Sequence, residues 1–213
     1  MVGKSHADSS LGSAAAEDGQ AGARQLLKML LEERFPQIWL PTVAGEDLRQ
    51  LLWHRCRLVR LRTKLRNQLD AIAKNEGLVG QRAGTQKGRQ QLAALPLSGW
   101  YQQRRQDLFE LLDELEQRIV PLNQAVQQAA AERADTQRLM THPGVGPVVA
   151  LGYVLAIGNW QRFPRGQHMA SYLGLIPEED SSSNKRCLGH ITKLGNSLVR
   201  WLLVQAAVKA AAR

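Results

Sequence analysis

Residues 48–73 read LRQLLWHRCRLVRLRTKLRNQLDAIA, and this stretch decides how the chain folds. An aliphatic residue returns at every seventh position, and further apolar residues flank these positions. Because a helix turns once in about 3.6 residues, such a repeat collects the apolar side chains into one stripe. The pattern predicts a long helix over residues 46–74 with a seam of Leu51, Leu58, Leu65 and Ile72, flanked by Leu48, Leu52, Val59 and Leu69.

A second repeat of the same kind begins at residue 108. It alternates steps of three and four residues, the spacing of a coiled-coil seam, through Leu108, Leu112, Leu115, Ile119, Leu122, Val126 and Ala129. The segment between the repeats is rich in glycine and basic residues. We therefore predict a mainly α fold with a long antiparallel coiled-coil-like helical hairpin, through which copies of the chain associate. The alternative is two ordinary amphipathic helices of a bundle, which would bury much the same residues.

The charge of the chain is concentrated in this region. The whole sequence holds 28 basic and 19 acidic side chains, a net charge of +9, whereas residues 48–105 hold 13 basic and 2 acidic ones. A solvated helix face usually mixes signs, so this block points to phosphate groups and hence to nucleic acid. A merely solvated basic surface is the alternative. The residues predicted to bind nucleic acid are Arg55, Arg57, Arg60, Arg62, Lys64 and Arg66.

Trp53 lies inside the same run. An indole stacks well on a base, but an apolar ring on an amphipathic helix more often packs in the core, and we favour the core for Trp53.

Residues 141–147 read THPGVGP and precede an apolar stretch, residues 148–157. A Pro-Gly-Val-Gly turn between helices is typical of a helix-hairpin-helix element, in which backbone N–H groups approach a DNA phosphate. We therefore predict a small helical C-terminal domain in which Gly144, Val145 and Gly146 contact DNA. The alternative is that the two glycines only allow a tight corner between helices.

The remaining segments of the sequence predict the ends of the fold and exclude some kinds of site. Residues 1–22 are small, polar and aperiodic, which predicts a disordered remnant. Residues 23–33 are predicted to form a helix. Asn196 is predicted to cap a final helix that runs through Ala212. Residues 177–189 predict a polar loop. The two cysteines, Cys56 and Cys187, provide no metal-ligand spacing. No apolar run suits a membrane span and no signal peptide is evident, so a cytoplasmic protein without membrane contact is expected.

Several fragments, in order, carry a resemblance to one known family. They read THPGVGP at 141–147, ASYLGLIP at 170–177, GHITKLGN at 189–196 and RWLLVQA at 200–206, with WLP at 39–41 and LVRLRTKLRN at 58–67 upstream. Over roughly residues 23–213 the chain resembles the bridge-RNA-guided insertion-sequence transposases of the IS110 family, including the IS116/IS902 type and relatives of the Piv invertases. The resemblance implies DNA transposition, with DNA and a guide RNA as partners.

The resemblance also implies a division of the chain. Residues 23–47 correspond to the tail of a ribonuclease-H-like domain, residues 48–140 to a helical linker, and residues 141–213 to a C-terminal domain whose serine attacks DNA. That serine aligns with Ser182, with Ser181 and Ser183 as alternatives. Attack on phosphorus would form a phosphoserine bond that conserves the energy of the broken phosphodiester. The cations expected around the phosphate are Lys185, Arg186 and Lys193.

The family's acidic metal site is not supplied by this chain. Two aspartates of its Asp-Glu-Asp-Asp set would fall on Gly19 and Gly22, and the other two acidic residues would precede Met1. We therefore expect an N-terminally truncated copy with no metal site or cofactor of its own, inactive alone, with magnesium bound only by the missing acidic domain. The alternative function is a non-enzymatic nucleic-acid-binding remnant or regulator. A helical scaffold would explain the heptads but not the basic block.

Overall fold

A computed structural model describes residues 22–34, 39–78, 80, 82–179 and 187–212. The chain divides into two compact units, Met1–Leu40 and Pro41–Arg213, and each is described by itself. In the first unit residues 22–31 form a helix, as predicted, and its apolar residues Leu26, Leu27, Leu30 and Leu31 are exposed. The disorder predicted for residues 1–22 lies outside the described residues except at Gly22.

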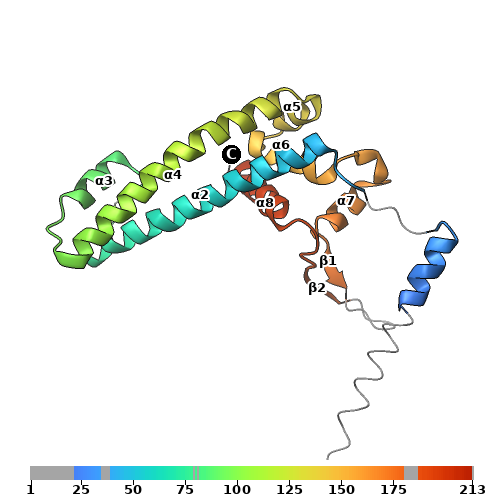
Figure 1. The fold of residues 1–213 in the computed structure, drawn as a ribbon, viewed down its shortest axis with the longest axis horizontal. Coiled ribbons are helices and arrows are strands. Elements are labelled where there is room, and N and C mark those ends of the chain that lie inside the picture. The colour runs from blue at the N-terminus through green and yellow to red at the C-terminus, as the bar shows by residue number, and fades with distance from the viewer. Residues whose placement is uncertain (1–21, 35–38, 79, 81, 180–186, 213) are drawn as a thin grey trace, which may run out of the picture. The chain divides into compact units, whose positions relative to one another are not determined.

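The second unit is mainly helical, as predicted, and its longest elements are α2 (Val43–Asn75) and α4 (Gly99–Ala131) (Figure 1). Thr42 starts α2, because its side-chain oxygen accepts a hydrogen bond from Gly45 N at 3.1 Å. The two helices pack antiparallel. Leu52, early in α2, shares a core cluster with Val126, late in α4, whereas Leu69 shares another with Leu112.

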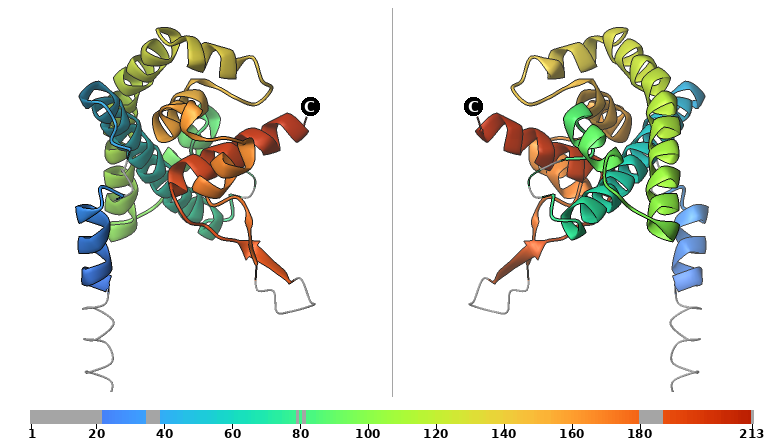
Figure 2. Two further views of the ribbon diagram at one scale, coloured as in Figure 1. Left: turned by 90° about the vertical axis from the view of Figure 1, so that its right-hand side faces the viewer. Right: turned by 90° about the vertical axis from the view of Figure 1, so that its left-hand side faces the viewer.

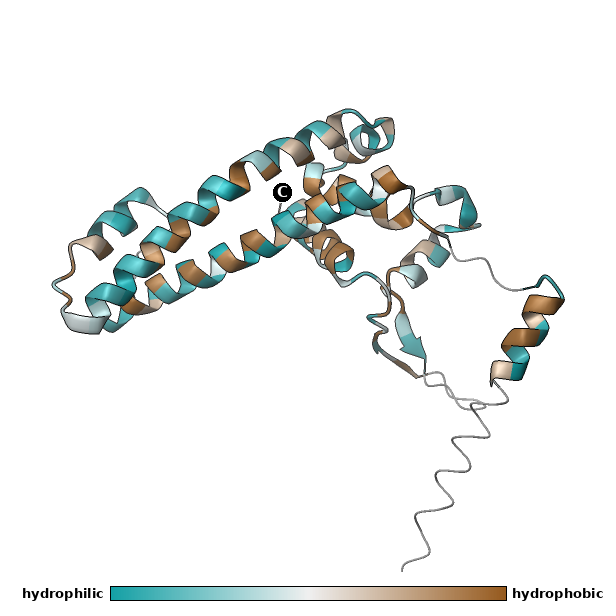
Figure 3. Ribbon diagram, in the orientation of Figure 1, coloured by the Kyte–Doolittle hydropathy of each residue, from teal (hydrophilic) through white to brown (hydrophobic). Residues whose placement is uncertain are grey.

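The seam of α4 follows the predicted spacing. Leu108, Leu112, Ile119, Val126 and Ala129 are buried, whereas Leu115 and Leu122 of the predicted seam are half-buried. On α2 the fully buried aliphatic side chains are Leu52, Leu69 and Ile72, whereas Leu51, Leu58 and Leu65 are half-buried. Figure 3 shows apolar residues recurring along both helices. The apolar stripe of α2 faces the partner helix, and on α2 burial is deepest toward the two ends of the hairpin, where further helices cover it.

One of these helices, α3 (Gln86–Ala93), lies in the glycine-rich connection, where the sequence predicted no helix. Thr85 caps it by accepting a hydrogen bond from Gly88 N at 3.1 Å. Leu92 of α3 is 1% exposed and packs with Leu69 and Leu112. Helix α3 therefore closes the core at the tip of the hairpin.

At the other end α5 (Ala134–Met140), α6 (Pro147–Ile157) and α8 (Ser197–Ala211) pack against the hairpin (Figures 1 and 2). Helix α6 is apolar on every side, as expected of a helix enclosed by others. Its Leu151 and Leu155 join the cluster of Leu52 and Val126, and Cys56 of α2 packs with Leu198 of α8. The segments predicted as 48–140 and 141–213 thus share a core within one unit.

Three short elements lie between α6 and α8. They are η1 (Trp160–Arg162), α7 (Gly166–Tyr172) and an antiparallel pair of strands, β1 (Pro177–Glu179) and β2 (Leu188–Ile191). The polar loop predicted over residues 177–189 was therefore wrong at its two ends. The strand residues are exposed, so they lack the apolar alternation by which a strand is recognised in a sequence.

Candidate nucleic-acid interface

The basic residues predicted on α2 divide between two sides of the helix. Two of them face α4: Arg55 Nε donates to Asn123 Oδ1 at 2.8 Å, and Arg66 Nη2 donates to Glu116 Oε1 at 2.5 Å. Part of the basic block is thus neutralised by the acidic helix beside it. These two guanidinium groups are bonded to α4 and link the two helices of the hairpin.

Arg62 lies between them along α2 and is half-buried. Burial lowers the pKa of Arg62, and the neighbouring Arg66 lowers it further. Its Nε is buried without a hydrogen-bond partner. Because the ordinary pKa of an arginine lies far above neutral pH, the Arg62 side chain remains charged at neutral pH despite this lowering. Arg62 is therefore a cation within the hairpin and less accessible to a phosphate than an exposed arginine.

Arg57, Arg60 and Lys64 lie on the other side of α2 and are exposed. Arg57 and Arg60 line a groove of about 260 Å³ between α2 and the start of α8, and we call it the α2–α8 groove. Its other lining residues are Trp53, Cys56, Asn196, Ser197 and Leu198. Figure 1 shows α8 beside this part of α2.

Aromatic rings accompany the two arginines. The Arg60 guanidinium lies 5.9 Å from the ring centre of Trp201, which is 47% exposed. Trp53 is half-buried and packs against the cluster of Cys56, Leu198 and Leu202. Trp53 is therefore partly in the core, as favoured from the sequence, and it also lines the groove.

The start of α8 adds a favourable field for anions. As predicted, Asn196 caps this helix, and its Oδ1 accepts from Leu198 N and Val199 N, each at 3.1 Å. A helix N-terminus carries a partial positive charge, and arginine suits phosphate because its planar group donates two parallel hydrogen bonds. The α2–α8 groove thus combines two exposed arginines with a helix N-terminus, an arrangement that favours binding of a phosphate.

The turn at residues 141–146, which we call the glycine turn, connects α5 to α6. Gly144 has a φ of +81°, and a Cβ added there would lie 2.3 Å from the carbonyl oxygen of Ala206 in α8. A Cβ on Gly146 would meet nothing within 4 Å, and Val145 between them is half-buried. Gly144 therefore serves the tight corner between helices, whereas the surface beside Gly146 is open to a ligand.

The structure describes the residues on either side of the three candidate serines but not the serines themselves. Ser181, Ser182, Ser183, Lys185 and Arg186 lie outside the described residues, between β1 and β2. Lys193, after β2, is exposed, and its backbone N donates to the carbonyl of Gly174 at 3.2 Å.

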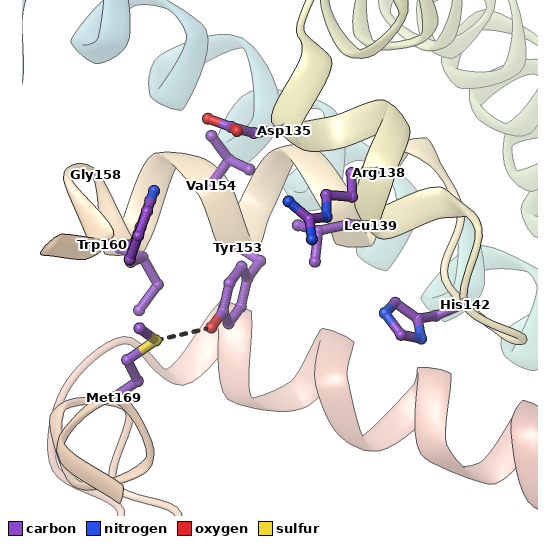
Figure 4. A pocket seen from close by; sticks show the side chains of 10 residues that line it. Asp135, Arg138, Leu139, His142, Tyr153, Val154, Gly158, Trp160 and Met169 are labelled. Carbon is purple, nitrogen blue, oxygen red and sulfur yellow. Dashed lines mark hydrogen bonds between the residues drawn. The ribbon is translucent and has the colours of Figure 1, made fainter. Parts of the chain in front are cut away.

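A second cavity lies beyond the glycine turn, between α5, α6, η1 and α7 (Figure 4). Its volume is about 250 Å³. Sequence reasoning singled out neither this cavity nor Trp201 and Ser197 of the groove. Their partners are distant in the sequence, so no periodic pattern marks them.

Two further findings concern the described residues only. They hold no group of three or more histidine, cysteine, aspartate or glutamate side chains placed to bind a metal ion. None of their helices combines the length and the hydropathy that crossing a bilayer requires.

The sequence of the chain is similar to those of known transposases. Residues 136–213 match the model of the transposase family IS116/IS110/IS902. The chain is 31% identical over 181 residues to a "Probable family 20 transposase" of Pseudomonas aeruginosa, covering 79% of this chain and 52% of that protein. It is also 31% identical over 172 residues to the transposase for insertion sequence element IS1111A of Coxiella burnetii, covering 78% and 47%.

A third relative is the transposase for insertion sequence element IS1328 of Yersinia enterocolitica, 29% identical over 179 residues, with 81% of this chain and 53% of the relative covered. The chain thus spans about half the length of the curated relatives it matches. The family match and these relatives agree with the motifs quoted above. The chain is therefore related to the IS116/IS110/IS902 transposases, and the match to the model of that family lies in residues 136–213.

Proposed function

We propose that the chain acts in DNA transposition and holds DNA phosphates in the α2–α8 groove. The observation that carries the proposal is the position of Arg57 and Arg60 beside the N-terminus of α8, in a chain related to transposases. Lys64, exposed one turn further along α2, extends the same basic side. Phosphate contacts position a nucleic acid without reading its sequence, so the groove is a docking site and not a specificity determinant.

A salt titration of binding to a DNA duplex tests this proposal. Each phosphate contact that is lost lowers the magnitude of the slope of log K against log salt by about one. We expect the Arg57→Ala, Arg60→Ala pair to flatten the slope by about two, and addition of Arg62→Ala to change it little, because Arg62 is half-buried. Arg118→Ala, at an exposed arginine on α4, is the matched control. An unchanged slope in the Arg57/Arg60 variant contradicts the groove.

The chemical step that we propose follows the family resemblance. The Ser182 hydroxyl attacks a DNA phosphorus, a phosphoserine bond forms, and a deoxyribose hydroxyl leaves with the proton. Attack by a hydroxyl of another DNA strand reverses these events and frees the serine. The bond energy is conserved throughout, so no nucleotide cofactor is consumed. Exposed Lys193 and the sequence neighbours Lys185 and Arg186 supply positive charge for the phosphate.

The residues of this chain do not fit the magnesium site that the family implies. Glycine stands at Gly19 and Gly22, where two of the metal-binding aspartates would align, and glycine has no side-chain ligand. We therefore propose that acidic residues from outside this chain complete the site. The hairpin, in the same proposal, also contacts a guide RNA and a second copy of the chain.

Covalent capture tests the serine step. The chain is incubated with DNA ends of a related insertion element, guide RNA and magnesium, together with a relative that supplies the acidic domain. A covalent adduct between this chain and DNA is expected, and Ser182→Ala is expected to abolish it. The DNA affinity of the variant should stay within about twofold of the wild type, because one neutral hydroxyl contributes little to phosphate binding. Ser181→Ala and Ser183→Ala separate the three serines. Binding without any adduct would support the alternative of a non-enzymatic nucleic-acid-binding protein.

A further inference from the structure

The cavity between α5, α6, η1 and α7 has two aromatic walls. Trp160 is 60% exposed and Tyr153 is half-buried, and Figure 4 shows Trp160 at one side of the pocket, Tyr153 near its middle and Met169 below them. The volume, about 250 Å³, is smaller than the space that drug-sized ligands occupy. The pocket therefore suits one flat ring system between two aromatic side chains.

The interior of the pocket is mostly apolar but carries one hydrogen-bonding group. Tyr153 Oη donates to Met169 Sδ at 3.2 Å, and a thioether is a weak acceptor. Burial raises the pKa of Tyr153, so the hydroxyl stays protonated and able to donate at neutral pH. A ligand with a ring nitrogen or carbonyl acceptor would give this hydroxyl a stronger partner than the sulfur.

The polar side chains at the rim of the pocket come from α5 and the turn that follows it. Arg138 and His142 come from α5 and the turn after it, and Asp135 lies one turn earlier on α5 (Figure 4). The same turn continues to Gly146, whose surroundings are open. A phosphate at the mouth of the pocket would meet the guanidinium of Arg138. Asp135 offers an acceptor for an exocyclic amino group.

We propose that this cavity binds a single base that has left the stack of a DNA strand. The base lies between Trp160 and Tyr153, and the flanking phosphates pass Arg138 and His142. Aromatic walls with an arginine at the rim suit an unpaired base, because every base has a flat face and every nucleotide an anionic link. A duplex base cannot enter while it remains paired and stacked, so the pocket distinguishes unpaired from paired nucleotides.

This inference rests on the proposed function, since it assumes that DNA is the partner. All the lining residues except Asp135 fall within residues 136–213, which match the transposase family.

The test compares a duplex with the same duplex carrying one unpaired 2-aminopurine. We expect the wild-type chain to bind the bulged DNA about tenfold more tightly and to quench its fluorescence, as stacking on an aromatic ring does. Trp160→Ala is expected to abolish the preference and the quenching while duplex affinity is kept, and Trp160→Phe to restore most of both. Trp100→Ala, at a tryptophan 87% exposed on α4, is the matched control. Equal affinity for the two DNAs in the wild type overturns the proposal.

A second arm separates failure of the pocket from failure of DNA binding. Deoxyadenosine monophosphate is titrated into the chain and into Trp160→Ala while tryptophan emission is recorded. Saturable quenching in the wild type that Trp160→Ala abolishes supports the pocket, even if no duplex binds and the proposed function fails. Duplex binding without any nucleotide effect overturns the pocket and leaves the α2–α8 groove intact. Thermal denaturation verifies that Trp160→Ala is folded, as an exposed position predicts.

Discussion

Replacing Gly144 with alanine is expected to lower the free energy of unfolding of the unit 41–213 by about 3 kcal/mol or more. The residue has a φ of +81°, which an L side chain rarely adopts, and its added Cβ would lie 2.3 Å from the carbonyl oxygen of Ala206. A backbone atom cannot rotate away as a flexible side chain can. The turn or α8 must therefore shift, and packing between α8 and the hairpin is lost. Urea denaturation followed by circular dichroism measures the effect.

Gly146→Ala is the matched control for this substitution. Gly146 has a φ of −102°, and a Cβ there meets nothing within 4 Å. The expected loss is about 1 kcal/mol or less, the ordinary difference between glycine and alanine at a helix N-cap. Comparable destabilisation by the two substitutions would contradict the role given to the contact between Gly144 and α8.

Reversing both charges of the α2–α8 groove, with Arg57→Glu and Arg60→Glu, is expected to weaken duplex DNA binding about a hundredfold or more at moderate salt. Each substitution removes a phosphate contact and places a negative charge beside the negatively charged phosphate. The new carboxylates also offset the partial positive charge of the α8 N-terminus, which would otherwise attract the phosphate. Because the two arginines are exposed, the fold should tolerate the change. Fluorescence anisotropy with a labelled duplex measures the affinity.

The control variant makes the same change in net charge elsewhere. Lys28→Glu and Arg118→Glu alter two exposed basic residues on other helices, of which Lys28 pairs with Glu32 and Arg118 pairs with Glu114. We expect less than about a fivefold loss from this pair, since only the general attraction is reduced. If both double variants weakened binding equally, total charge and not the groove would govern affinity.

The long hairpin was predictable because its signal is local and repeated. Leu112, Ile119 and Val126 recur at helical spacing, and they are buried as that spacing requires. Helix α3 escaped prediction because glycine and proline dominate its surroundings, and its single buried leucine, Leu92, finds its partners on two other helices. The strands β1 and β2 escaped because their side chains are exposed.

The candidate site was predictable only in its chemical character. The sequence shows that residues 48–105 are strongly basic, but it does not show that Arg55 and Arg66 bind Asn123 and Glu116 while Arg57 and Arg60 line a groove. Neighbouring arginines point in different directions around a helix, and which direction meets solvent depends on where the other helices pack. The same holds for Gly144, whose contact with Ala206 spans more than sixty residues of chain.

By itself, the sequence determined the mainly helical fold, the long hairpin and the basic character, because heptad spacing and charge are properties of residues near one another in the chain. The motifs between residues 141 and 206 likewise identified the family, which the match over residues 136–213 confirmed. Only the tertiary structure decided which arginines are free to meet a phosphate, which glycine serves a helix corner, and where Trp160 and Tyr153 enclose a pocket. Each of these depends on atoms that packing, and not sequence proximity, brings together.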